Sequence, residues 1–439
     1  MVRAYRRVAS AMWVSLTVMM AGACTPAASP TESEADKPPP PGVSPALDSV
    51  RAIRGASLTV SYYAYGPSDV FFERFGHAAL GVRDERTGMD VAFNWGMFDF
   101  AQPNFLGRFL TGDTKYSMVG YPTAAFNAAY QGDNRTIRQQ VLALTPVERA
   151  ALFEFLQWNA REEHKYYRYD YYRDNCSTRL RDALDRVLGG QLQPALAGPG
   201  SGRTWRGETA RLLASMLPLY AGIEIALGRH ADEPLSKWDE EFLPEHMATH
   251  FESLVLTDAS GAHRKLVARD TVLFTADRVP LPSEAPDRLA MSALLGLAIA
   301  GLIALLTDAR SRVARVIVTA FVALWYFVAG LLGTALLLAG TVTKHIPYMG
   351  ANTTLLALQP LLLIAAFVVP FALARRTPSR AAKGISAVIA LMSICAILTH
   401  FVPAWTQSNG VVLATVVPIH VAIALAVWRL DRGTSNRSA

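Results

Sequence analysis

Five long apolar segments constrain this chain more than any other feature of its sequence. Each has about the 17–25 residues that an α-helix needs to cross the hydrocarbon layer of a membrane. Of the 439 residues, 51% are apolar and only 18% are charged, which excludes a disordered chain, a coiled coil and an ordinary soluble enzyme. The segments occupy residues 288–306, 313–339, 354–374, 384–403 and 411–428.

Basic residues in the connecting loops predict how these segments are oriented. The loops on one side and the tail hold ten of them: Arg310, Arg312, Arg315, Arg375, Arg376, Arg380, Lys383, Arg429, Arg432 and Arg437. The opposite loops, 340–353 and 404–410, hold only Lys344. The positive-inside rule therefore predicts a cytoplasmic C-terminus and an exported region before the first span. Because much of the excess charge sets topology, the net charge of +6 does not indicate a nucleic-acid partner.

The region before the first span divides into three parts. Residues 1–24 read as a signal peptide, with Arg3, Arg6 and Arg7 before a short apolar stretch and Ala21-Gly22-Ala23-Cys24 at its end. This ending resembles a lipobox, which predicts lipidation of Cys24; the alternative is an uncleaved anchor. Residues 25–50 are a disordered Pro-rich linker, and 51–285 form one periplasmic domain. Residues 286–439 then form a five-helix transmembrane domain with a cytoplasmic tail.

The first chemical motif is a predicted β-hairpin that contains His77. Residues 75–82 and 89–96 read as strands, because the charged stretch between them contains Thr87-Gly88, a turn signal. A turn over residues 85–88 brings His77 near Trp95 and Gly96, with Asn94 within a residue or two across the sheet. Asn94 is thus expected to orient the imidazole, and Asp99 is the alternative.

The second motif places Cys176 at the start of a helix. Leu180, Leu184 and Leu188 recur at helical spacing, and Asn175 is a good N-cap residue. Free N–H groups and the helix dipole at this point favour a thiolate, so the sequence predicts a lowered pKa for Cys176. With His77 nearby it would be an activated nucleophile, and the same N–H groups could hold an oxyanion. Three cysteines are too few for a disulfide framework. Cys395 lies inside a predicted membrane-spanning segment, where we expect it to be a packing residue.

These motifs together resemble the Lnb N-terminal periplasmic domain family. The residues that carry the resemblance are Gly76-His77, the 93–100 strand, Tyr169-x-Tyr171, and Asn175-Cys176-Ser177-Thr178-Arg179 with Asp182. His345 and Asn352 similarly resemble the family's extracytoplasmic loop. The resemblance implies an α+β domain with a permuted papain-like (NlpC/P60-like) core, in which the histidine strand precedes the cysteine helix. An α-helical five-span transmembrane bundle follows it.

The resemblance also implies a function. A bacterial lipoprotein N-acyltransferase of the inner membrane would move a fatty acyl chain from phospholipid, through a Cys176 thioester, to the α-amino group of a lipoprotein's N-terminal cysteine. It would need no cofactor. The catalytic residues would be Cys176, His77 and Asn94. The substrate-binding or supporting residues would be Asn175, Tyr169, Tyr171, Arg179, Asp182, His345 and Asn352.

Two other interpretations remain open for the same motifs. One is a membrane-anchored NlpC/P60-like cysteine amidase or peptidase that acts on peptidoglycan, for which five spans are excessive. The other is a non-catalytic membrane scaffold. The presence of both Cys176 and His77 argues against this interpretation. A metal site is not expected, because His246 and His250 have helical spacing but no third ligand. Whether the acyl donor is a phospholipid or the lipoprotein's own glyceride is also left open.

Overall fold

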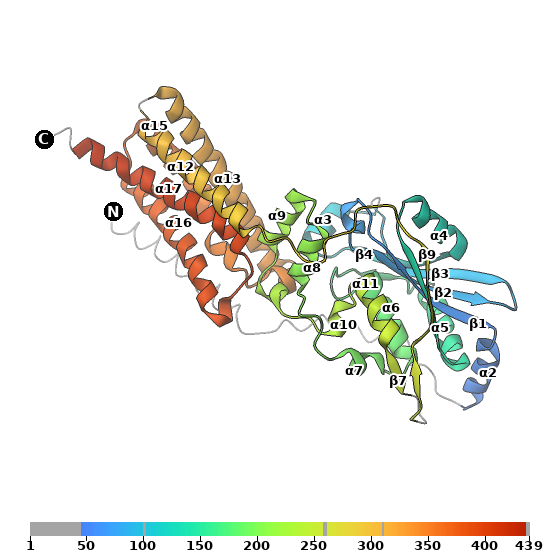
Figure 1. The fold of residues 1–439 in the computed structure, drawn as a ribbon. Coiled ribbons are helices and arrows are strands. Elements are labelled where there is room, and N and C mark those ends of the chain that lie inside the picture. The colour runs from blue at the N-terminus through green and yellow to red at the C-terminus, as the bar shows by residue number, and fades with distance from the viewer. Residues whose placement is uncertain (1–44, 100–101, 258–260, 310, 436–439) are drawn as a thin grey trace. The chain divides into compact units, whose positions relative to one another are not determined.

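The computed structural model describes residues 45–99, 102–257, 261–309 and 311–435 (Figure 1). The predicted signal peptide, Cys24 and most of the linker lie outside these residues. The described chain forms two compact units. The first, here called the sheet unit, contains residues 45–213 and Pro234–Ser283; the second, here called the helical unit, contains Ala214–Glu233 and residues from Glu284 onward. A short segment from the middle of the chain thus belongs with the C-terminal helices.

The sheet unit is built on a seven-stranded antiparallel sheet. Its strand order is β6-β4-β3-β2-β1-β5-β9, and a two-stranded sheet pairs β7 with β8. The strands are β1 (Leu58–Tyr65), β2 (His77–Asp84), β3 (Met89–Met97), β4 (Lys115–Pro122), β5 (Ile137–Leu142), β6 (Tyr166–Arg168), β7 (Val255–Thr257), β8 (His263–Lys265) and β9 (Val267–Phe274). The helices are α2 (Pro45–Gly55), η2 (Phe71–Glu73), α3 (Phe105–Thr111), α4 (Thr123–Gly132), α5 (Pro146–Asn159), α6 (Cys176–Val187), α7 (Leu192–Leu196), α8 (Trp205–Leu212), α10 (Lys237–Glu240) and α11 (Pro244–Ser253).

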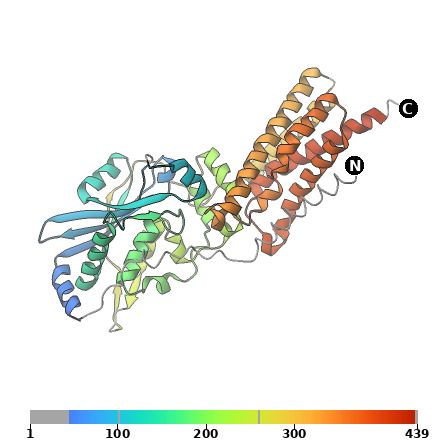
Figure 2. The same cartoon turned by 180° about the vertical axis from the view of Figure 1, so that it is seen from behind.

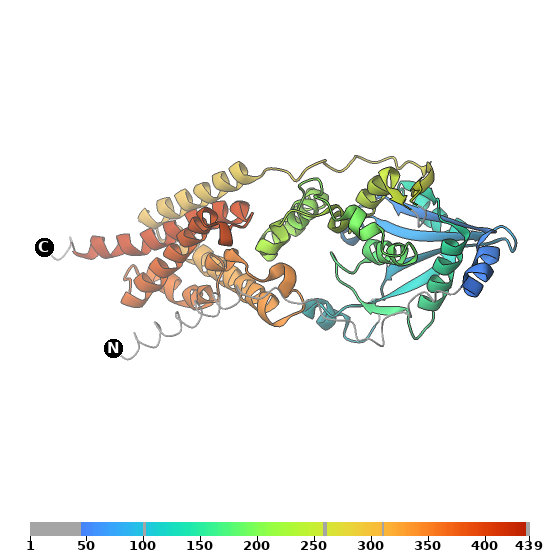
Figure 3. The ribbon, with the colours of Figure 1, turned by 90° about the horizontal axis from the view of Figure 1, so that it is seen from below.

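Helices cover both faces of the central strands. Alternate residues of β1, among them Val60 and Tyr62, pack in one core with α5 and α6. Tyr63 and Tyr65 point to the other face, where Phe126 of α4 packs against them. The ribbon shows α4 on one side of the central strands and α5 and α6 on the other (Figures 1 and 3). Because side chains alternate along a strand, burial of both faces explains why six of the eight residues of β1 are apolar or aromatic. The mixed α+β class that the sequence predicts is confirmed.

The predicted hairpin is confirmed in detail. β2 and β3 pair antiparallel in the register Leu80↔Phe93, and the turn covers the residues between Asp84 and Met89. This register follows from the sequence, because a shift by one residue would turn the apolar side chains of both strands to the opposite face.

The helical unit contains five apolar helices long enough to cross a membrane, as the sequence predicts (Figure 2). α12 packs on α17, α13 on α15, and α16 on α17. Many outward apolar side chains are exposed, as side chains that face lipid would be; Leu305, for example, is 72% exposed. The elements are α9 (Leu217–Ala226), η3 (Arg229–Asp232), α12 (Leu289–Asp308), α13 (Arg312–Val342), α14 (Ile346–Met349), η4 (Thr353–Leu356), α15 (Leu361–Arg375), α16 (Arg380–Leu398), η5 (Thr399–Phe401), η6 (Pro403–Trp405) and α17 (Gly410–Ser435).

Asn352 attaches the inserted segment 214–233 to the helical unit. Its side-chain amide donates to the carbonyls of Ile225, Ala226 and Leu227, at distances of 2.9, 3.1 and 3.3 Å. These carbonyls end α9 and have no partner within the helix. Gln407 also donates to the Leu227 carbonyl, at 3.0 Å, and to Asn352 Oδ1, at 3.0 Å. Asn352 is 5% exposed, so these bonds form away from water, where each is hard to replace.

Replacing Asn352 with alanine is therefore expected to destabilise the helical unit. The loss should be about 1–3 kcal/mol, because buried carbonyls would lose their donor. Thermal unfolding in detergent measures it, together with protease cleavage within residues 214–233. Ser408→Ala is the matched control, because Ser408 is exposed and its contact with Asp232 is made by its backbone N–H. Equal unfolding temperatures and cleavage rates for the two variants would contradict this role.

Candidate active site

His77 lies at the start of β2 and is oriented by Asn94 from β3. The Nε2 atom of His77 is 3.2 Å from Asn94 Oδ1. The Asn94 amide is itself fixed, because its Nδ2 donates to the Val119 carbonyl of β4 at 3.0 Å. Oδ1 can only accept, so Nε2 must carry the proton and Nδ1 must hold the free lone pair. The predicted proximity of His77 and Asn94 is confirmed, and Asn94 rather than Asp99 makes the contact that the structure shows.

Cys176 is the first residue of α6, and Asn175 caps the helix. The Asn175 side-chain oxygen accepts from the N–H groups of Ser177 and Thr178, at 2.8 and 3.0 Å. Its Nδ2 donates to the carbonyls of Tyr171 and Phe242, at 3.1 and 2.9 Å. One buried side chain thus ties the helix start to two other segments. These bonds fix the backbone beneath Cys176, and a supporting role of Asn175 in the reaction stays a prediction.

Gly96 separates the cysteine from the histidine. A Cβ atom added at Gly96 would lie 3.2 Å from Cβ of Cys176 and 3.8 Å from Cε1 of His77. The two side chains therefore approach the same point, from α6 and from β2. Gly96 also has a φ of +89°, which side-chain-bearing residues rarely adopt. Only glycine leaves this point open for a reacting group.

Burial determines the resting protonation states of both groups. It lowers the pKa of His77 to about 4, although the bond to Asn94 opposes this shift. It raises the pKa of Cys176 to about 11, although the N–H groups of Ala78, Cys176 and Ser177 stabilise the thiolate. The sequence-based expectation of a lowered cysteine pKa is therefore wrong for the resting protein, because desolvation outweighs the helix start. The resting pair is a neutral thiol and a neutral imidazole.

Aromatic rings enclose the pair. Tyr65 and Tyr130 stack with their centroids 4.0 Å apart, and the Tyr130 ring lies nearly parallel to His77 at 6.0 Å. Tyr169 stacks on Tyr116 at 4.0 Å. Burial, with a further contribution from the Cys176 charge, raises the pKa of Tyr116 to about 12. These rings pack around the half-buried cysteine and the imidazole.

Other aromatic residues in and beside these motifs mainly form the core. Trp95 is 1% exposed and donates from Nε1 to Asn159 at 2.8 Å. The Tyr172 hydroxyl hydrogen-bonds Thr209 at 2.7 Å. The Phe93 ring packs against Phe153. Phe98 is the exception, because its ring lies among those of Phe72, Phe105 and Tyr116.

The remaining predicted residues have structural contacts. Arg179 pairs with Asp174 and its guanidinium lies 3.9 Å from the Tyr167 ring centroid. Asp182 pairs with Arg181 at 2.8 Å on the exposed side of α6. Tyr171 stacks edge-on against Tyr172. His345 precedes α14 in the helical unit, as Asn352 precedes η4. A role of any of these in substrate binding stays a prediction.

Within the described residues, one cluster has the composition of a metal site: Glu208, Glu245 and His246. Two arginines already neutralise its carboxylates. Arg211 pairs with both Glu208 and Glu245, and Arg203 pairs with Glu208. His250, the other histidine of the predicted helical pair, contacts Glu240 at 3.3 Å instead. The cluster is a set of ion pairs, and it does not fit a cation.

Arg135 is a site residue that the sequence did not reveal. It is 3% exposed, donates from Nε to the Gly66 carbonyl at 2.8 Å and pairs with Glu73 at 3.3 Å. Its guanidinium carbon lies 4.5 Å from the Tyr130 ring centroid, and its Nη2 has no hydrogen-bond partner. Its charge lowers the pKa of both Cys176 and His77. A single arginine in a loop after α4 carries no sequence signal, because only the fold brings it behind Tyr130.

The pKa of Cys176 predicts an unusual pH profile of thiol reactivity. An exposed cysteine approaches its maximal alkylation rate above about pH 8.5. For Cys176 the rate with iodoacetamide should still rise about tenfold per pH unit from pH 7 to 10, because the thiol pKa is about 11. Measurement in the full-length Cys395→Ala protein, with free cysteine as the reference, tests this. A plateau near pH 8 would contradict the burial argument.

Replacing Arg135 with glutamine should slow this alkylation. Loss of the charge raises the pKa of the thiol, so less thiolate is present at a given pH; we expect a decrease of about three- to tenfold at pH 8. Arg135→Lys, which keeps the charge, should retain most of the rate. The His77 pKa, measured by NMR, should rise in Arg135→Gln. If the role of Arg135 were purely structural, both variants would change the alkylation rate equally, and the His77 pKa would not rise in Arg135→Gln.

One protein family matches the part of the chain that contains this site. Residues 48–212 match the family model described as the Lnb N-terminal periplasmic domain. No curated protein and no solved structure matches the chain. The matched region contains His77, Asn94 and Cys176, and five apolar helices follow it. The family suggests a lipoprotein-modifying enzyme, and this organisation indicates a membrane protein with a periplasmic domain. Residues 48–212 therefore match an Lnb N-terminal periplasmic domain, and this match supports an Lnb-type protein.

Proposed function

We propose that the chain is a bacterial lipoprotein N-acyltransferase of the inner membrane. The observation that carries the proposal is the meeting of Cys176 and His77 at the open point beside Gly96, inside an Lnb-type domain. The proposed donor is a membrane phospholipid. The proposed acceptor is the α-amino group of a lipoprotein's lipidated N-terminal cysteine.

The first half-reaction forms a thioester. His77 Nδ1 takes the thiol proton as the Cys176 sulfur attacks the donor's ester carbonyl. Since the resting pair is neutral, proton transfer accompanies attack rather than preceding it. The Cys176 N–H at the start of α6 is suited to stabilise the oxyanion of the tetrahedral intermediate. The intermediate collapses when the lysophospholipid oxygen leaves with the proton from His77, which returns to its neutral form.

The second half-reaction transfers the acyl group to nitrogen. The acceptor's amine attacks the thioester carbonyl, and His77 Nδ1 takes a proton from that nitrogen. The carbon–sulfur bond breaks, the proton returns to the Cys176 sulfur, and the product amide is released. The imidazole is neutral at neutral pH and can therefore accept this proton. The aromatic enclosure supports transfer over hydrolysis, because it limits the access of water to the thioester.

The proposed topology places the acyl donor within reach of the domain. Residues 51–285 would lie in the periplasm, the bundle of residues 286–439 would anchor them, and the C-terminus would be cytoplasmic. Support comes from the arginine-rich loops at the C-terminal side of the bundle and the single Lys344 opposite. Both lipid substrates are then held in the leaflet that faces the domain.

Mass spectrometry of lipoprotein N-terminal peptides tests the proposal. A bacterial strain without other N-acyltransferases would express the wild-type protein or no protein. The expected result is an N-linked acyl chain only with the wild-type protein. The ester-linked chains that remain identify the donor: two remain if a phospholipid gave the acyl group, and one remains if the lipoprotein's own glyceride did. Unchanged N-termini together with altered muropeptides would support the amidase instead.

A further inference from the structure

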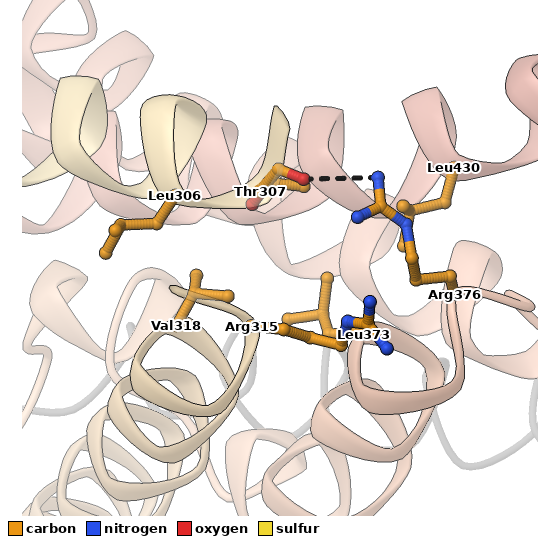
Figure 4. A pocket seen from close by; sticks show the side chains of 7 residues that line it. All are labelled: Leu306, Thr307, Arg315, Val318, Leu373, Arg376 and Leu430. Carbon is orange, nitrogen blue, oxygen red and sulfur yellow. Dashed lines mark hydrogen bonds between the residues drawn. The ribbon is translucent and has the colours of Figure 1, made fainter. Parts of the chain in front are cut away.

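A pocket in the helical unit contains two guanidinium groups. Arg315 reaches it from the first turn of α13, and Arg376 from the residue that ends α15. Both side chains extend into the same space between the helices in Figure 4. The walls are apolar, with Leu306 from α12, Val318 from α13, Leu373 from α15 and Leu430 from α17. Two positive charges thus lie beside a small, partly open space that residues of four helices line.

No described carboxylate neutralises these charges. Arg376 donates to the carbonyls of Ala309 and Thr307, at 3.3 and 3.4 Å, and both acceptors are neutral. The Nε atom of Arg315 is buried and has no hydrogen-bond partner. The nearest acidic residue in sequence, Asp308, pairs with Arg429 instead, at 3.5 Å. Like charges repel, and a buried donor without an acceptor is unfavourable, so this arrangement suits a bound anion.

The backbone holds Arg376 in place. Its φ of 53° lies in the left-handed region, which costs free energy for a residue other than glycine. This conformation ends α15 and lets the guanidinium reach the carbonyls at the end of α12. A strained backbone that presents a charged side chain to a pocket is typical of a binding site rather than of a passive loop.

The position of the pocket selects the kind of anion. α12 ends at Asp308, α13 begins at Arg312 and α15 ends at Arg375, so the pocket lies where three apolar helices reach the same end of the bundle. Helices of about 20 residues match the hydrocarbon thickness, so their ends lie at the level of the lipid phosphates. Basic pockets between spanning helices at this level are suited to anionic head groups.

We propose that this pocket binds the phosphate group of an anionic phospholipid. The Arg315 and Arg376 guanidinium groups would donate to the phosphate oxygens, as arginine does in two-pronged phosphate contacts. The site is separate from Cys176, and its existence does not depend on acyl transfer.

Lipid binding to the purified, delipidated full-length protein tests this site. The Cys176→Ala background prevents consumption of a lipid as an acyl donor. Native mass spectrometry and thermal unfolding would compare phosphatidylglycerol, phosphatidylcholine and diacylglycerol. We expect phosphatidylglycerol to bind and to raise the unfolding temperature most. Arg315→Gln should weaken its binding about tenfold, because a charged hydrogen-bond donor is lost. Arg312→Gln is the matched control, because Arg312 is exposed on the same helix and does not line the pocket.

Three outcomes would overturn the proposal. The first is equal binding of phosphatidylglycerol by the Arg315→Gln and Arg312→Gln variants. The second is equal binding of phosphatidylglycerol and diacylglycerol by the Cys176→Ala protein, which would mean that the phosphate makes no contribution. The third is that inorganic phosphate stabilises the protein as strongly and displaces the lipid, which would make the pocket a simple anion site. If Arg315→Gln does not fold, the comparison of the three lipids on the Cys176→Ala protein still decides the question.

Discussion

Replacing Cys176 with alanine is expected to abolish acyl transfer while leaving the fold intact. The sulfur is the only group in the proposed mechanism that bonds to the acyl chain, so its loss should lower the rate by about 10³-fold or more. The substitution removes one atom from a half-buried side chain whose neighbours are fixed by Asn175, so unfolding should change little. The assay uses purified full-length protein, phospholipid and a diacylated lipopeptide, with mass spectrometry of the product.

The intermediate can be detected directly in the same system. Wild-type protein mixed with donor alone should gain the mass of one acyl chain, and neutral hydroxylamine should remove it, because thioesters are cleaved under conditions that spare ordinary esters. The matched control is Cys395→Ala, which removes the other described free cysteine from α16. It should transfer and acylate like the wild type. Transfer that survives in Cys176→Ala, or an acyl mass that remains on it, would contradict the proposed nucleophile.

Replacing Gly96 with alanine is expected to cause the second largest loss. The new methyl group would lie 3.2 Å from Cβ of Cys176 and 3.8 Å from Cε1 of His77, in the space where the reacting ester must sit. Displacement of either group by about an ångström is enough to reduce a rate about 10²-fold. The expected result is a fall in the transfer rate of this size, and alkylation of Cys176 by a bulky reagent should slow as well.

Gly88→Ala separates this blocking effect from backbone strain. Gly88 also has a positive φ, +73°, but an added Cβ there would meet nothing within 4 Å. Both variants therefore carry a strained alanine, and only Gly96→Ala places an atom between the cysteine and the histidine. Gly88→Ala should lose a similar amount of stability and keep its activity. Comparable rates for the two variants, at equal folded fractions, would show that Gly96 is not needed to keep the site open.

Local patterns of the sequence were sufficient to predict those helices and strands that depend mainly on residues close together in the chain. The five apolar segments predicted the five long helices, because burial in hydrocarbon requires an apolar run of defined length. The turn at Thr87-Gly88 predicted the hairpin and brought His77 to Asn94, because strand pairing from a short turn has few possible registers. The cap at Asn175 predicted where α6 begins.

The chemical state of the site and the division of the chain depended on the tertiary structure. Local sequence favoured a thiolate at Cys176, but the surrounding protein raises the thiol pKa to about 11, because desolvation depends on every residue packed around the sulfur. Arg135 reaches the site through a loop, and Asn94 is oriented by the Val119 carbonyl of another strand. Asn352 joins residues 225–227 to the C-terminal helices. The sequence by itself determined the β2–β3 hairpin, the start of α6 and the five long helices, since those depend on local patterns of residues. Contacts between residues far apart in the chain decided the rest: how deeply Cys176 is buried, which charge lies near it, and which groups Asn94 and Asn352 bind.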